Sequence, residues 1–167
     1  MESVRWIIDG YNLIRREPRL SSVERRQGSA AARAFLDGEL SRFRARKGRG
    51  HSVLVVYDGG AASARTQVAS GFQAIYSGKN HTADLVILDE ARKLEGRMAV
   101  RVVTSDVQDI GGRLRGLQVS VYSTHRFAQE LWPAGSPDFE EEKPKPPKGR
   151  DVDFWLREFG EEPDSEA

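Results

Sequence analysis

The sequence predicts an α/β fold with a mostly parallel sheet of five strands flanked by helices, and two observations support this prediction. First, several short segments are apolar on both faces or nearly so, as in residues 6–8, 53–56 and 100–103. Strands of this kind belong to parallel sheets that helices cover on both sides. Second, segments with helical spacing of apolar residues lie between these strands, and such alternation is typical of α/β proteins.

The strands are expected where short runs rich in β-branched or aromatic residues are bounded by Gly, Asp or Ser. These runs cover residues 4–8, 52–57, 72–76, 100–104 and 117–122.

Two longer helices are expected, over residues 22–47 and 82–94, because apolar residues recur there at helical spacing. Gly48 and Gly96 mark their ends. Two shorter helices are expected over residues 106–115 and 124–132.

The chain divides into three parts, a folded body at 1–132, a linker at 133–150 and a short helix with an acidic tail at 151–167. The linker prediction rests on composition, because five of the seven prolines lie in residues 133–147 among charged side chains. The apolar residues near position 155 predict a helix that either docks on the body or binds a partner.

Composition excludes several classes of protein. The chain has no cysteine, which excludes a disulfide framework and a thiolate metal site. The N-terminus has neither a basic lead nor a long apolar core, so no signal peptide is expected. No apolar run approaches the roughly 20 residues that span a bilayer. We therefore expect a cytoplasmic protein with no membrane partner.

Charge is distributed unevenly along the chain. Residues 1–132 hold 21 Lys and Arg against 14 Asp and Glu, a net +7, whereas residues 133–167 hold 5 against 11, a net −6. A basic body with an acidic tail suits a surface that binds a polyanion and a tail that screens it. The alternative interpretation is an arginine-rich composition spread over solvated helix faces.

Acidic residues follow the predicted strands. Asp9 follows the first strand, Asp58 the second and Asp106 the fourth, with Asp109 one turn later, and Asp84 opens the helix that begins at 82. Because ligands bind beyond the carboxyl ends of parallel strands, these carboxylates are expected to converge.

Converging carboxylates raise each other's pKa, and a divalent cation relieves this. Oxygen ligands without a His or Cys cluster favour Mg²⁺ or Mn²⁺ over Zn²⁺, and such an ion supports phosphodiester hydrolysis. Taken singly, an Asp at a strand end is common in turns, and Asp84 and Asp106 would complement a helix dipole. Their combination at one edge favours the metal site.

Four motifs resemble those of one family. The sequence resembles the NYN domains, in particular the YacP-like branch related to PIN nucleases, over residues 4–132. The matching motifs are Asp9-Gly10-Tyr11-Asn12, Asp58-Gly59, Thr82-Ala83-Asp84 and Val103-Thr104-Ser105-Asp106.

The resemblance implies a Rossmann-like sheet of strand order 3-2-1-4-5 and an RNA nuclease that depends on Mg²⁺ or Mn²⁺. It implies that the core metal ligands and catalytic residues are Asp9, Asp84 and Asp106. Asp58 and Asp109 would be additional or shared ligands, and Asn12 would orient a ligand or bind substrate.

Substrate contacts are expected beside these acids. Lys79 and Asn80 precede a helix N-terminus, which attracts anions. Arg15 and Arg16 begin a basic stretch suited to the RNA backbone. Three further interpretations stay open. Tyr11 either stacks on a base or packs at the sheet edge, Ser105 either binds substrate or caps a helix, and His81 either donates a proton or is solvated. The Gly- and Ala-rich stretch 59–71 is expected to be a mobile loop that can close over substrate.

Other functions fit less well. A haloacid dehalogenase phosphatase needs a second Asp two residues after the first, where this chain has Tyr11, and a receiver domain needs paired acids there. No Gly-x-Gly-x-x-Gly run follows a strand, which argues against a dinucleotide site. The remaining rival is a PIN-like module that binds RNA or the ribosome without cutting. The three acids favour a nuclease acting on mRNA, rRNA or tRNA, and an open edge of strands with no threading domain favours an endonuclease.

Overall fold

The computed structural model describes residues 2–134. The predicted linker and C-terminal helix therefore lie outside the described residues, apart from positions 133 and 134. Within the described part, no helix is both long and apolar enough to cross a membrane.

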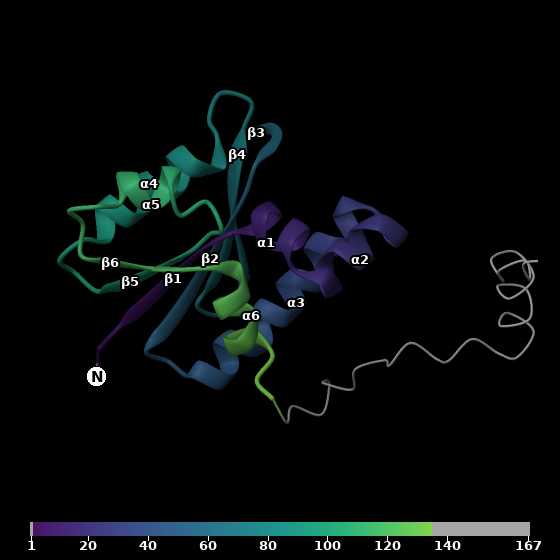
Figure 1. Cartoon of the computed structure of the whole chain (residues 1–167), viewed down its shortest axis with the longest axis horizontal. Helices are drawn as coiled ribbons and strands as arrows, with labels where there is room; N and C mark the ends of the chain where they lie inside the picture. Colours follow the sequence, from purple (N-terminus) through teal and green to yellow (C-terminus); the bar gives the residue numbers. More distant parts are fainter. Residues whose placement is uncertain (1, 135–167) are drawn as a thin grey trace, which may run out of the picture. The chain divides into compact units, whose positions relative to one another are not determined.

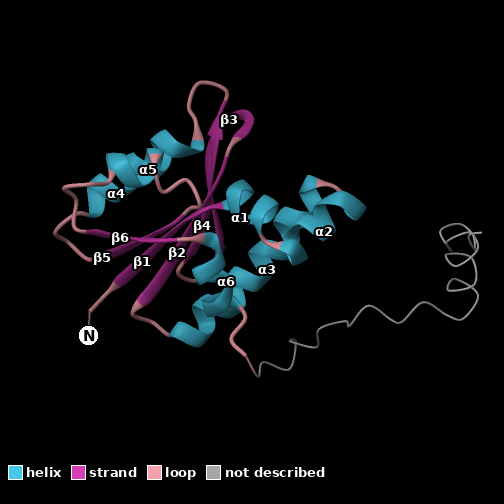
Figure 2. Ribbon diagram, in the orientation of Figure 1, coloured by secondary structure: helices cyan, strands magenta, loops and turns pink. Residues whose placement is uncertain are grey.

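A sheet of six strands forms the centre of the described part, in the order β3-β4-β2-β1-β5-β6 (Figure 2). All neighbouring strands are parallel except β3 and β4, which are antiparallel. The strands are β1 (Val4–Asp9), β2 (His51–Tyr57), β3 (Gly59–Ala69), β4 (Phe72–Gly78), β5 (Ala99–Val103) and β6 (Val119–Tyr122).

Helices cover both faces of this sheet. Figure 1 shows α1, α2, α3 and α6 on one face and α4 and α5 on the other. Their bounds are α1 (Gly10–Arg16), α2 (Pro18–Gln27), α3 (Ser29–Lys47), α4 (Ala83–Leu94), α5 (Asp109–Arg113) and α6 (Thr124–Leu131). The predicted α/β fold and the helix predicted from residue 82 are confirmed.

The prediction of a mobile loop over residues 59–71 is wrong, because this stretch forms the edge strand β3. Its Gly, Ala and Ser residues carry no alternating pattern, so only pairing with β4 reveals the strand. That pairing is irregular, with register shifts between Gly59 and Ala64 and between Gln67 and Ala69. The sheet therefore has six strands where five were predicted, with β3 added at one end of the expected order.

The prediction of a single helix over residues 22–47 is also wrong, because two helices, α2 and α3, meet at Gly28. Gly28 has φ +91°, a left-handed conformation that interrupts helical hydrogen bonding and that glycine adopts without steric cost. The first of these helices begins earlier than predicted, at Pro18, whose fixed φ suits the first helical position. The helix expected over 106–115 is shorter than predicted and covers only Asp109–Arg113.

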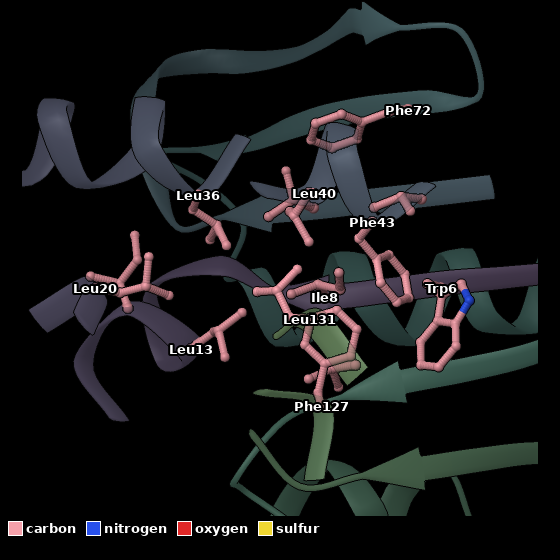
Figure 3. Packing of buried hydrophobic residues seen from close by; sticks show 14 of the residues in the cluster. Trp6, Ile8, Leu13, Leu20, Leu36, Leu40, Phe43, Phe72, Phe127 and Leu131 are labelled. Carbon is pink, nitrogen blue, oxygen red and sulfur yellow. The ribbon is translucent and has the colours of Figure 1, made fainter. Parts of the chain in front are cut away.

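Trp6 lies at the centre of the core on the α3 and α6 face. Its ring makes edge contacts with Phe43 at 5.2 Å and Tyr122 at 5.3 Å and a tilted contact with Phe127 at 5.5 Å (Figure 3). Its indole Nε1 donates to Nδ1 of His51 at 3.1 Å, so the buried polar group is satisfied. This packing fixes β1, the strand that ends at Asp9.

Candidate active site

A cleft of about 420 Å³ lies at the carboxyl edge of the sheet, between α1 and the start of α4. Its walls include four of the predicted acids, Asp9, Asp58, Asp84 and Asp106. They also include four residues predicted to bind substrate, Tyr11, Asn12, Arg15 and Arg16. The fold thus gathers side chains from positions 9 to 106 in one place, as expected for the edge of a parallel sheet.

Asp9 is the last residue of β1 and also the N-cap of α1. Its Oδ1 accepts a hydrogen bond from the backbone N–H of Asn12 at 3.4 Å, and the residue is only 9% exposed. Burial raises the pKa of Asp9 to about 6, and the nearby charges of Asp84 and Asp58 act in the same direction. The Asn12 hydrogen bond and Arg15 oppose this shift without cancelling it.

Asp58 fixes the start of α4 against β2. Its Oδ1 accepts hydrogen bonds from the backbone N–H of Ala83 and from the Ser77 hydroxyl, both at 3.1 Å. The Thr82 hydroxyl caps the same helix by accepting from the N–H of Leu85. Asp58 therefore holds Asp84 in place through its capping contact.

Asp84, Asp106 and Asp109 form the tightest acidic group in the described residues, with one carboxylate oxygen of each within 4.8 Å of the others. Burial raises the pKa of Asp84, and the charges of Asp106 and Asp109 raise it further, while Arg113 opposes them. Arg113 also pairs with Asp109 at 3.2 Å. Asp9 lines the same cleft but lies outside this group. The structure thus groups Asp109, which the resemblance implied only as an additional or shared ligand, with Asp84 and Asp106.

Asn12 joins the loop after β1 to the loop after β5. Its Oδ1 accepts from the backbone N–H of Ser105 at 2.9 Å and from the Ser105 hydroxyl at 2.8 Å. The next residue, Asp106, is held by a hydrogen bond from its N–H to Thr104 Oγ1 and by one from Asp109 N–H to its own Oδ1. The contact between Asn12 and Ser105 thus positions the neighbouring residue Asp106.

Tyr11 packs at the sheet edge. Its ring lies edge-on to Tyr57 at 5.4 Å, and its hydroxyl accepts a hydrogen bond from Arg33. The guanidinium of Arg15 lies over the other side at 5.5 Å from the ring centre. Tyr57 and Arg33 belong to none of the sequence motifs, and their contribution to the site comes only through tertiary contact.

Lys79 and Asn80 do not line the acidic cleft. They line a separate hollow of about 320 Å³ with His81 and residues 61–63 of β3. Ser105 and Arg16 line a further hollow of about 630 Å³ that shares Asn12 and Asp106 with the cleft. The expected substrate residues therefore surround the acids on two sides.

The donor set of the cleft fits a hard divalent cation. Every acidic ligand offers carboxylate oxygen, the preference of Mg²⁺ and Mn²⁺. Burial is the largest cause of the raised pKa values of Asp9 and Asp84, and the charges of neighbouring acids add to it.

A Rossmann-like sheet with aspartates converging beyond its central strands defines an α/β domain of the PIN-like class. Residues 6–135 match the family model described as the YacP-like NYN domain. The chain belongs to this family, as the sequence motifs predicted.

Two solved structures share the fold, and both are of Rae1 (YacP) from Bacillus subtilis. A crystal structure of a tryptophan-to-leucine mutant matches with a TM-score of 0.63 and 23% identity, over 78% of this chain and 75% of that one. Another crystal structure of Rae1 matches with a TM-score of 0.59 and 24% identity, over 78% and 74% of the two chains. A search of curated proteins finds no match.

Proposed function

We propose that this protein is a metal-dependent ribonuclease that hydrolyses RNA phosphodiester bonds endonucleolytically. The observation that supports this best is the acidic group of Asp84, Asp106 and Asp109, whose carboxylate oxygens lie within 4.8 Å of one another beside Asp9. Membership of a nuclease-like family supports the same conclusion.

Five carboxylates are available to hold Mg²⁺ or Mn²⁺. Asp9, Asp84 and Asp106 are proposed as the core ligands, with Asp58 and Asp109 as additional or shared ones. When bound, the cation would activate a water for attack on phosphorus and stabilise the charge that develops on the phosphate.

The protein's own residues position these ligands. Asn12 holds the Ser105–Asp106 turn against α1, and Asp58 holds the first turn of α4, which carries Asp84. Because these contacts exist before substrate binds, the carboxylates need little rearrangement, and such preorganisation favours electrostatic catalysis.

Arg15 and Arg16 are proposed to bind the RNA backbone beside the acids. Both are exposed, both line the cleft, and both lie in the last turn of α1. Guanidinium groups bind phosphate through paired hydrogen bonds, and such contacts weaken as salt increases. They would offset the repulsion between the acidic cleft and an anionic substrate.

The endonucleolytic mode rests on the openness of this edge. Within residues 2–134, the cleft lies at the end of the strands, and no second domain of the described chain covers it. An internal segment of RNA can therefore reach the acids without threading from an end.

The decisive test is cleavage of a mixture of single-stranded and structured RNA in Mn²⁺ or Mg²⁺. We expect wild-type cleavage to be abolished by EDTA and reduced on the order of 100-fold by Asp9→Asn, because the acid acts on developing charge. Glu95→Gln, on an exposed acid after α4, is the matched control and should cleave as wild type does.

Absence of wild-type cleavage, with salt-sensitive RNA binding intact, would contradict the nuclease proposal. It would favour the rival assignment, an RNA- or ribosome-binding module.

A further inference from the structure

We propose that a groove between β3 and α4 binds a nucleobase of the RNA, with preference for bases that carry an amino group. This inference rests on the proposed function and adds a specificity site to it. The groove has a volume of about 450 Å³, within the usual range of ligand sites. The residues that matter here are Arg65, Ile75, Leu85, Asp89, Glu90 and Lys93.

The groove has an apolar wall that solvent reaches. Leu85 is 49% exposed although it lies in the first turn of α4, and Ile75 and Val86 continue the apolar surface beside it. An exposed leucine alone is ordinary, but here it lines a concave site next to packed aliphatic side chains. Such a wall offers a flat base an apolar contact surface.

Arg65 supplies a fixed planar group. Its Nη1 donates to Oε1 of Gln73 at 3.0 Å and its Nη2 donates to Oε1 of Glu90 at 2.6 Å, while the side chain remains 44% exposed. Two in-plane hydrogen bonds hold the guanidinium in one orientation and leave its faces for stacking. Arginine planes of this kind stack on unpaired RNA bases.

The rim of the groove carries a hydrogen-bond acceptor. Asp89 is exposed and pairs with Lys93 at 2.7 Å, which holds its carboxylate beside the groove. Aspartate accepts hydrogen bonds from the amino group of cytosine, and the amino group of adenine is an equivalent donor. Uracil has no amino group and offers only its N3–H as a donor, so it makes fewer hydrogen bonds to this acceptor.

The charges in the groove balance, which favours a base over a phosphate. Arg65 and Lys93 are matched by Asp89 and Glu90 in direct ion pairs. An uncharged ring meets no charge repulsion in such a site, whereas a phosphate would meet both carboxylates. Backbone contacts are better supplied by the exposed arginines of α1, on the other side of the cleft.

Residues that line the groove and residues that line the acidic cleft are neighbours in the sequence. Leu85 directly follows Asp84, so their Cα atoms are about 3.8 Å apart. In the preceding loop, His81 lines the groove and Thr82 lines the cleft. Figure 1 shows this loop and the start of α4 beside the end of β4. A nucleotide next to the scissile phosphate can therefore place its base in the groove.

The test measures binding of labelled single-stranded oligocytidylate, oligoadenylate and oligouridylate of equal length to the full chain in EDTA. We expect the first two to bind about fivefold more tightly than oligouridylate. Asp89→Ala should remove this preference, whereas the charge-matched control Glu95→Ala should preserve it. Leu85→Ala should weaken binding of all three about fivefold, whereas Val68→Ala, at an exposed apolar site on β3, should not.

Two results would overturn the groove proposal. One is equal or tighter binding of oligouridylate by the wild-type chain. The other is a base preference that Asp89→Ala leaves unchanged together with affinities that Leu85→Ala leaves unchanged, which would place the preference elsewhere or leave the groove to a protein partner. Metal-dependent cleavage is measured separately, so either result can occur while the nuclease activity stands, and base preference in EDTA can occur without any cleavage.

Discussion

Asp9 meets two requirements that oppose each other. In its proposed role as a metal ligand it must be ionised, yet it is 9% exposed at the end of a buried strand and faces other acids. Burial and repulsion both disfavour the charged form, which is why the pKa of Asp9 is raised to about 6. An ionised carboxylate in this position lowers the stability of the metal-free protein.

Asp9→Asn should therefore stabilise the metal-free protein at high pH. An acid whose pKa is raised by folding contributes full stability below its unfolded pKa of 3.8 and loses it as pH rises through about 6. At pH 8 the variant should be more stable than wild type by about 3 kcal/mol, and the difference should vanish near pH 3.5. Asparagine keeps the capping oxygen, so the helix start is preserved.

Urea unfolding in EDTA at pH 3.5, 6 and 8 measures this difference, with Glu95→Gln as the control whose stability should follow wild type. A constant offset at all three pH values would show that Asp9 acts through packing and not through its charge.

The sequence predicts these acids well, but it does not predict the contacts that hold them in position. Asp9 and Asp106 could be located because each follows an apolar strand, and parallel strands end at one edge. The bond between Asn12 and Ser105 joins residues 93 positions apart, so no local pattern reveals it. Lys79 and Asn80 follow β4, but the extension of β3 alongside that strand places them in a separate hollow.

At the scale of elements, α1 is seated by two contacts at its start. A Cβ added to Gly10 would lie 2.5 Å from Cε1 of Tyr57, so glycine permits the helix to begin directly against β2. One turn on, Asn12 bonds to Ser105 after β5. The helix thus connects the two strands on either side of β1, and this connection sets the spacing of the acids.

Asn12→Ala should lower kcat by about 10- to 100-fold with little change in KM, because the carboxylates remain but are less well positioned. The free energy of unfolding should fall by about 1–3 kcal/mol, since the partly buried backbone N–H of Ser105 loses its acceptor. Ser105→Ala removes only the hydroxyl bond and keeps the backbone bond, so its effects should be smaller.

Steady-state kinetics in Mn²⁺ together with urea unfolding measures both effects. An increase in KM at unchanged kcat would instead assign Asn12 to substrate binding, one of the two roles that the resemblance implied.

Elements with periodic apolar residues could be predicted, and those without could not. Helix α4 and the buried strands carry clear patterns. Helix α1 has only seven residues and follows Asp9 directly, so its pattern is too short to recognise. Strand β3 contains mostly small residues and is defined by its partner β4. The break at Gly28 was hidden because apolar spacing continues across it.

At the scale of the whole molecule, charge is segregated. The net charge of +7 in residues 1–132 coexists with an acidic cleft, and exposed arginines of α1 lie beside that cleft. The net charge of −6 in residues 133–167 belongs to a segment outside the described residues. A polyanion and this segment would compete for the same basic surface.

Deleting residues 133–167 should tighten RNA binding by about fivefold at low salt, because an intramolecular competitor is removed. The difference should shrink at high salt, because electrostatic interactions are screened beyond about 3 Å at 1 M. Fluorescence anisotropy across a salt series measures both chains. Equal affinity of the two chains at low salt would remove the competition hypothesis.

The position of β1 has a consequence for how the protein opens. Strand β1 has hydrogen-bonded neighbours on both sides, whereas β3 lies at the edge and pairs only with β4. Amide protons of β3 can exchange with solvent through local fraying, while those of β1 exchange only when the sheet comes apart. Asp9 thus lies at the end of a central strand, and we expect its placement to persist when the edge strand β3 frays.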